Sequence, residues 1–79
     1  MDTPETSPED EPYRVAFGKR LRALREQAGL SQSGAARAIG LDRSFYAGVE
    51  AGRHSIAADR LPGVARVLGV EVSDLFPRS

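Results

Sequence analysis

The sequence contains no cysteine, no tryptophan and only one histidine in its 79 residues. Without cysteine the chain has neither a disulfide framework nor a thiolate metal site, and a reducing cytoplasm is the expected location. A single histidine cannot build a metal cluster or a catalytic Ser/His/Asp set, and the glycines form no phosphate-binding loop. These absences predict a protein that is not an enzyme and that binds no metal or cofactor.

Long hydrophobic runs are also missing. No apolar segment approaches the roughly 18 residues of a membrane-spanning helix, and the acidic N-terminus is unlike that of a signal peptide. The length allows one small hydrophobic core, which is marginally stable alone and gains from association. We therefore expect no membrane contact and no separate domain for a small-molecule ligand.

The formal net charge is zero, but the two signs are unevenly distributed along the chain. Residues 1–12 hold five acidic side chains, three prolines and no Lys or Arg. They bury too little apolar surface to offset ordering entropy, so we expect a disordered acidic tail, either a solubilising extension or a competitor for the basic face. Residues 13–79 hold eleven basic and six acidic side chains, with the surplus between residues 13 and 53. That surplus predicts a polyanionic partner.

Residues 31–50 carry the signals of two short helices joined by a tight turn. Ser31 and Asp42 are N-cap residue types, and Gly40 suits the left-handed conformation in which the first helix ends. Apolar residues fall on one face of each segment: Ala35, Ala36 and Ile39, then Tyr46 and Val49. The pattern predicts helices over 32–39 and 43–51, which form a helix-turn-helix.

Three further helical segments complete an all-α domain over residues 13–79. Apolar residues at three- and four-residue spacing predict a helix over 13–28, which Gly29 ends. A helix over 60–68 accommodates Pro62 in its first turn if Asp59 is the N-cap. Ser73 is expected to cap a last short turn over 74–76. Five helices are therefore predicted.

Several short motifs match one known pattern: Ser31-Gln32, Gly40-Leu41-Asp42, Val49-Glu50-x-Gly52, Leu68-Gly69-Val70 and Asp74-Leu75-Phe76. In these residues the chain resembles the Cro/repressor-type (XRE) helix-turn-helix family over about residues 14–76. Asp42-Arg43-Ser44-Phe45-x-x-Gly48 is also similar to the recognition helix of restriction–modification controller proteins. The resemblance implies a five-helix, lambda-repressor-like fold.

The resemblance further implies a regulator of transcription that binds double-stranded DNA at specific sequences. The helix over 43–51 would lie in the major groove, where Arg43 can pair with guanine and Phe45 can touch a thymine methyl or brace the backbone. The expected base-contacting residues are Arg43, Ser44, Phe45 and Ala47. The expected phosphate-contacting residues are Gln32, Arg20, Arg53 and His54. The alternative for each is an ordinary exposed side chain without a role in DNA binding.

Two structural expectations concern the interior. The family commonly pairs an arginine at the position of Arg25 with a glutamate at that of Glu50, and a buried Glu50 would be costly without such a partner. Ala35 and Tyr46 stand where the family usually has a larger and a smaller residue respectively. We expect the Tyr46 ring to fill the space beside Ala35, with its hydroxyl at the surface.

One small domain reads only a few base pairs, so we expect a homodimer on a pseudo-palindromic operator. The expected dimer surface is apolar and C-terminal, unless these residues belong to the core: Leu61, Val64, Val70, Val72 and Phe76. Two other functions fit the sequence. One is a protein-interaction module of the antitoxin or anti-regulator kind, against which the basic half argues. The other is a non-specific, nucleoid-type DNA binder.

Overall fold

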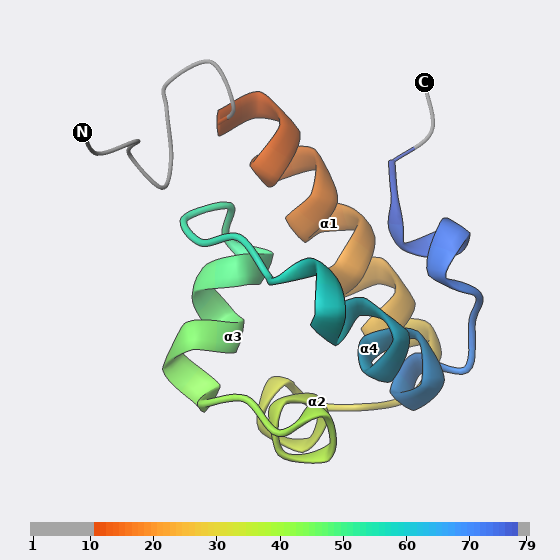
Figure 1. Ribbon diagram of the computed structural model, residues 1–79. Coiled ribbons are helices and arrows are strands. Elements are labelled where there is room, and N and C mark those ends of the chain that lie inside the picture. The colour runs from red at the N-terminus through yellow and green to blue at the C-terminus, as the bar shows by residue number, and fades with distance from the viewer. Residues whose placement is uncertain (1–10, 78–79) are drawn as a thin grey trace.

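The computed structural model describes residues 11–77, which form one bundle of short helices (Figure 1). Within this span there are four α-helices, two 3₁₀ turns and no β-strand. The elements are α1 (Glu11–Gln27), α2 (Gln32–Ile39), α3 (Arg43–Glu50), η2 (Ala58–Arg60), α4 (Leu61–Leu68) and η3 (Val72–Leu75). None of these helices is both long and apolar enough to cross a membrane.

The expectation of a fifth helix is not met. The last segment closes through bonds between residues three apart, from the Asp74 N–H to the Glu71 carbonyl at 2.9 Å and from the Phe76 N–H to the Ser73 carbonyl at 3.4 Å. Pro77 follows directly, and the short segment between Gly69 and this proline leaves room for a 3₁₀ turn only. The all-α class is as predicted.

The first helix begins earlier than its apolar stripe suggested. Glu11 and Pro12, assigned from sequence to the acidic tail, form the first turn of α1. Proline is tolerated there because its missing N–H has no partner in the first turn. The rest of the predicted tail lies outside the described residues.

The caps around the helix-turn-helix are as predicted. The Ser31 hydroxyl accepts a hydrogen bond from the Gly34 N–H at 3.0 Å, and the Asp42 carboxylate accepts one from the Phe45 N–H at 3.1 Å. Gly40 ends α2 at a φ of 94°, a left-handed conformation that glycine adopts without strain.

Two other predicted caps are wrong. The chain enters α4 through the 3₁₀ turn η2, so Asp59 lies inside that turn and Arg60 is the N-cap residue. At η3 the cap is Glu71 rather than Ser73, because Glu71 and Asp74 form a capping box.

The core lies where the helices converge. Among residues 11–77 it contains eleven buried apolar residues, of which Leu21, Ala35, Tyr46 and Leu75 are fully buried. The helix α1 packs against both α3 and η3, while α2 packs against α3 and α4. At the crossing of α1 and α3 a Cβ on Gly18 would lie 2.6 Å from the Val49 carbonyl oxygen, so only glycine fits. This crossing fixes the orientation of α3 on the scaffold.

Candidate nucleic-acid interface

The helix α3 presents one face to the core and the other to solvent. Tyr46 and Val49 are fully buried, whereas Arg43 and Ser44 at the start of the helix are exposed. Figure 1 shows α3 at an edge of the molecule, with its N-terminal end away from α1. Ala47 is half-buried beside these residues. The start of α3 is therefore an accessible, positively charged tip on a rigid helix.

Phe45 and His54 form an aromatic stack on α3. Their ring centroids lie 5.1 Å apart and their planes are 6° from parallel. The His54 ring covers Gly48, where a Cβ would lie 2.8 Å from the imidazole Nε2 and closer still to Cδ2. His54 was expected to contact a phosphate or to be an ordinary exposed loop residue; it is exposed, but its stack on Phe45 was not predicted. Gly48 indicates room on this side of the helix but does not indicate which side chain fills it.

An ion pair between Arg25 and Glu50 joins α1 to the end of α3. The guanidinium donates to both carboxylate oxygens, at 2.7 Å from Nε and 3.1 Å from Nη2. Only 10% of the Arg25 side chain and 3% of the Glu50 side chain are exposed. The same guanidinium donates to the Leu30 carbonyl at 2.8 Å, and this bond links α1 to the turn before α2.

Gln32 belongs to this cluster as well. Its side-chain amide donates to Glu50 Oε1 at 2.9 Å, so one carboxylate links α1, α2 and α3. Burial alone would raise the pKa of Glu50, but its hydrogen bonds, chiefly the one from Arg25, outweigh burial and hold the pKa below its ordinary value. The hydrogen bond with Glu50 raises the pKa of Arg25. Glu50 is therefore ionised at neutral pH.

The Tyr46 ring is buried as expected, but the position expected for its hydroxyl is wrong. Both Tyr46 and Ala35 are fully buried, as required if the ring fills the space that a small residue leaves. The hydroxyl does not reach the surface, because it lies inside the core near the Glu50 carboxylate. Within the described residues it has no hydrogen bond of standard geometry, although it is near enough for Glu50 to act on it. Burial, reinforced by Glu50, raises the Tyr46 pKa.

The four residues expected at phosphates have different surroundings. Arg53 is exposed directly after α3, and His54 follows it in the stack with Phe45. Gln32 opens α2, with its side-chain amide already engaged by Glu50. Arg20 is tied to the far side of the domain, where its Nε donates to the Asp74 carbonyl at 2.8 Å. We therefore leave Arg20 out of the interface.

Arg14 has a structural role that the sequence did not suggest. Its Nε donates to the Gly52 carbonyl at 3.2 Å and so links α1 to the turn that follows α3. Gly52 has a φ of 83°, and a Cβ there would lie 2.7 Å from the Val15 Cγ2 atom. No local sequence pattern links two residues this far apart.

The expected dimer residues divide into core and surface. Val64 is fully buried inside α4, so its assignment to a dimer surface is wrong. Leu61, Val70 and Phe76 are partly buried at the edge of the core, and Val72 is exposed. The α4 helix turns Val64 inward because it lies on the same face as Leu68, which is also buried.

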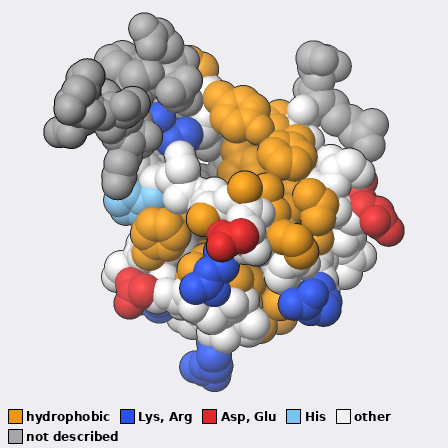
Figure 2. All heavy atoms as spheres, in the orientation of Figure 1, with side chains coloured by type: hydrophobic (Ala, Val, Ile, Leu, Met, Phe, Trp, Pro, Cys, Tyr) orange, Lys and Arg blue, Asp and Glu red, His pale blue; other side chains and the backbone are white. Residues whose placement is uncertain are grey.

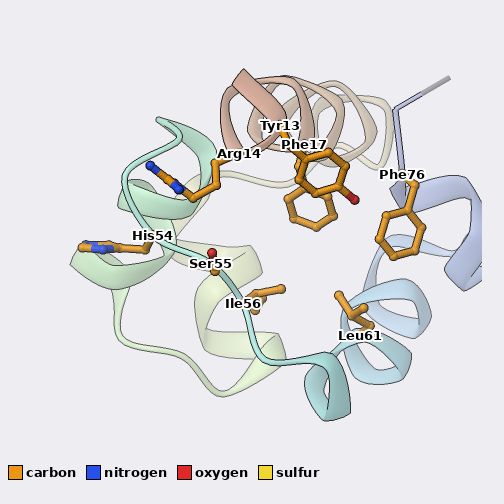
Figure 3. Close-up of a pocket in the computed structure, with 8 residues that line it drawn as sticks. All are labelled: Tyr13, Arg14, Phe17, His54, Ser55, Ile56, Leu61 and Phe76. Carbon is orange, nitrogen blue, oxygen red and sulfur yellow. The ribbon is translucent and has the colours of Figure 1, made fainter. Parts of the chain in front are cut away.

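Leu61 and Phe76 help to line an open pocket of about 100 Å³. Figure 3 shows the rings of Tyr13, Phe17 and Phe76 on one side of it, and Ile56 and Leu61 on the other. The Phe17 and Phe76 rings are 5.9 Å apart and tilted by 50°. Figure 2 shows hydrophobic side chains gathered on this face. The domain thus carries an apolar face in addition to its charged tip.

The chain is similar in sequence to helix-turn-helix regulators. The family model described as a helix-turn-helix domain matches residues 16–75. The control protein C.MunI of Mycoplasma sp is 36% identical over 64 residues, which cover 80% of this chain and 86% of that protein.

Solved structures agree with the sequence matches. The restriction-modification controller protein C.AhdI from Aeromonas hydrophila superposes with a TM-score of 0.76 at 43% identity, over 80% of this chain and 96% of that one. The hypothetical transcription factor NHTF from Neisseria superposes with a TM-score of 0.77 at 32% identity, over 98% and 90% of the two chains.

Proposed function

The chain belongs to the helix-turn-helix domain family, and on this premise we propose that it regulates transcription by binding specific sequences in double-stranded DNA. One observation carries the proposal. The start of α3 exposes Arg43 and Ser44, while the opposite face of the helix is locked into the core by Tyr46, Val49 and Glu50. A helix held in this way can enter the major groove as a rigid body.

Arg43 is the principal base reader in this proposal. Its guanidinium can donate two hydrogen bonds to O6 and N7 of one guanine, the most common specific contact in the major groove. Ser44 bonds a neighbouring base or phosphate, and the small Ala47 lets the helix approach the base edges closely. Phe45 contacts a thymine methyl group.

Phosphate contacts would orient the domain on the duplex. Arg53 lies exposed directly after α3, within the basic part of the chain. Gln32 offers its backbone N–H at the start of α2, where the first N–H groups of a helix have no partner within the helix. Its side chain remains with Glu50 and fixes this helix end relative to α3.

We further propose a two-fold homodimer bound to a pseudo-palindromic operator. One copy of α3 contacts only a few base pairs, and a second copy doubles the recognised sequence. The proposed contact combines Leu61 and Phe76, which line the pocket, with Val70 and Val72 from the same C-terminal part of the chain, because a core this small gains stability when such apolar surface is covered.

Sedimentation velocity tests the dimer. Val72→Glu introduces a charge at an exposed position of η3 and should convert a dimer into a monomer without unfolding it. Ala38→Glu makes the same kind of change at an exposed position of α2 and should leave the dimer intact. A wild-type protein that sediments as a monomer at DNA-binding concentrations would remove this part of the proposal.

Selection of bound duplexes from a random pool, repeated at several salt concentrations, tests the function. Enrichment of a two-fold symmetric motif supports the proposal. Binding without a motif, with a steep loss of affinity on adding salt, would identify a non-specific binder instead. No binding at all would leave the apolar face as the functional surface and favour a protein partner.

A further inference from the structure

The aromatic stack joins α3 to the loop that follows it. With about 100° of rotation per residue, Ser44, Ala47 and Gly48 lie on the side of the helix opposite Tyr46 and Val49. That side faces outward, yet Gly48 is buried, because the His54 ring covers it. The loop after α3 therefore folds a ring back onto the outward face of the helix.

His54 is held in this place by its backbone as well as its ring. The N–H groups of Arg53 and His54 both donate to the Gly48 carbonyl, at 2.8 and 3.3 Å. The ring then lies parallel to Phe45 at 5.1 Å, the geometry of an offset aromatic stack. Phe45, which is half-buried, therefore packs against the core and is also stacked against His54.

We propose that His54 is a specificity-determining positioning residue, which fixes the Phe45 ring for contact with the 5-methyl group of a thymine. This inference rests on the proposed function, because it requires α3 to lie in the major groove. His54 acts through Phe45 and reads no base itself.

The chemistry favours a methyl group as the target. Phe45 has no hydrogen-bonding atom, and the thymine methyl is the apolar group that the major groove displays. Phe45 packs against the core with only part of its ring, so the exposed part can still tilt, and its contact with so small a group would then be lost. A stacked partner restricts the ring to one orientation before DNA binds.

Gly48 is the third part of this arrangement. Alanine would bring its Cβ into the space of the His54 ring and would displace it from Phe45. Alanine is favoured over glycine in a helix interior, so Gly48→Ala should disturb the stack without unfolding α3. This variant moves the His54 ring while keeping the histidine itself, so it tests whether the position of the ring matters.

The test measures the affinity for duplexes in which single thymines are replaced by deoxyuridine, a change that removes only the methyl group. The duplex is the one that the wild-type protein selects from a random pool. For the wild type we expect that deoxyuridine at one thymine per half-site weakens binding about fourfold. This is the ratio of affinities that corresponds to the free energy of burying one methyl-sized group. The His54→Ala and Gly48→Ala variants should lose this discrimination.

Two variants serve as controls. His54→Phe keeps a flat ring over Gly48 and should retain the fourfold discrimination. Arg53→Ala removes the neighbouring exposed side chain and should weaken binding to all duplexes equally, with the thymine discrimination unchanged. Retention of the discrimination by His54→Ala would overturn the proposal, and so would a wild type that does not distinguish any thymine from uracil.

The outcomes also separate this inference from its premise. If His54→Ala and His54→Phe weaken every duplex alike and make binding less sensitive to salt, His54 contacts a phosphate and the positioning role is wrong. If the wild type selects no motif, the proposed function itself fails. A selected motif with no role for His54 overturns the inference alone.

Discussion

Removal of one partner from the Arg25–Glu50 pair should strongly destabilise the protein. In an Arg25→Met variant, the Glu50 carboxylate stays almost wholly buried and keeps from the described hydrogen bonds only the Gln32 amide. Breaking a buried pair in this way costs roughly 3–5 kcal/mol. A 79-residue protein has a total stability of about 4–12 kcal/mol, so the loss is a large fraction of the whole.

The double variant Arg25→Met/Glu50→Leu should recover much of this loss. It removes both charges and leaves two neutral groups without their partners. These are the Leu30 carbonyl, at a cost of about 1–3 kcal/mol, and the amide of the partly exposed Gln32 side chain. Urea unfolding followed by circular dichroism on the wild type, both single variants and the double variant gives the coupling energy. Single variants that each lose less than about 1 kcal/mol and combine additively would refute the reasoning.

Three further predictions concern stability. Gly18→Ala should lower Tm by at least about 4 °C, because its Cβ would meet the backbone of α3. The matched variant Gly63→Ala should not be destabilised, because its Cβ meets only a flexible arginine side chain. Equal Tm values for the two variants would contradict this prediction. Asp42→Ala should cost about 1 kcal/mol in urea unfolding through loss of the α3 cap. Because the folded state lowers the pKa of Glu50, its contribution is complete above about pH 4.3 and declines at lower pH. Glu50→Gln should therefore show a weaker acid dependence of unfolding than the wild type, and unchanged dependence would exclude Glu50 as the group responsible.

Local signals in the sequence predicted most of the fold. Ser31, Gly40 and Asp42 fixed the boundaries of the helix-turn-helix, because caps and left-handed turns depend only on neighbouring residues. The start of α4 was predicted less well. Asp59 resembles a cap, yet a 3₁₀ turn precedes the helix, and the choice between these conformations depends on packing around the loop.

The positions of some candidate site residues in the fold were predicted. Arg43 and Ser44 lie exposed at the start of α3, as expected from their position after the cap. The stack of His54 on Phe45 required knowledge of how the loop after α3 folds back, which depends on long-range contacts such as that of Arg14 with Gly52. Val64 was misassigned because an apolar residue in a short helix fits the core as well as an exposed apolar surface, and the sequence alone does not distinguish the two.

The central claim is that α3 reads DNA sequence through Arg43. The most direct test is a random-pool selection carried out in parallel with the wild type, with Arg43→Ala and with Arg66→Ala, which removes the same charge from an exposed position on α4. We expect one motif for the wild type and Arg66→Ala, and a motif relaxed at one base pair per half-site for Arg43→Ala, with a loss of about 1–3 kcal/mol on the wild-type duplex. An unchanged motif for Arg43→Ala, or a uniform loss of affinity across all sequences, would contradict the account.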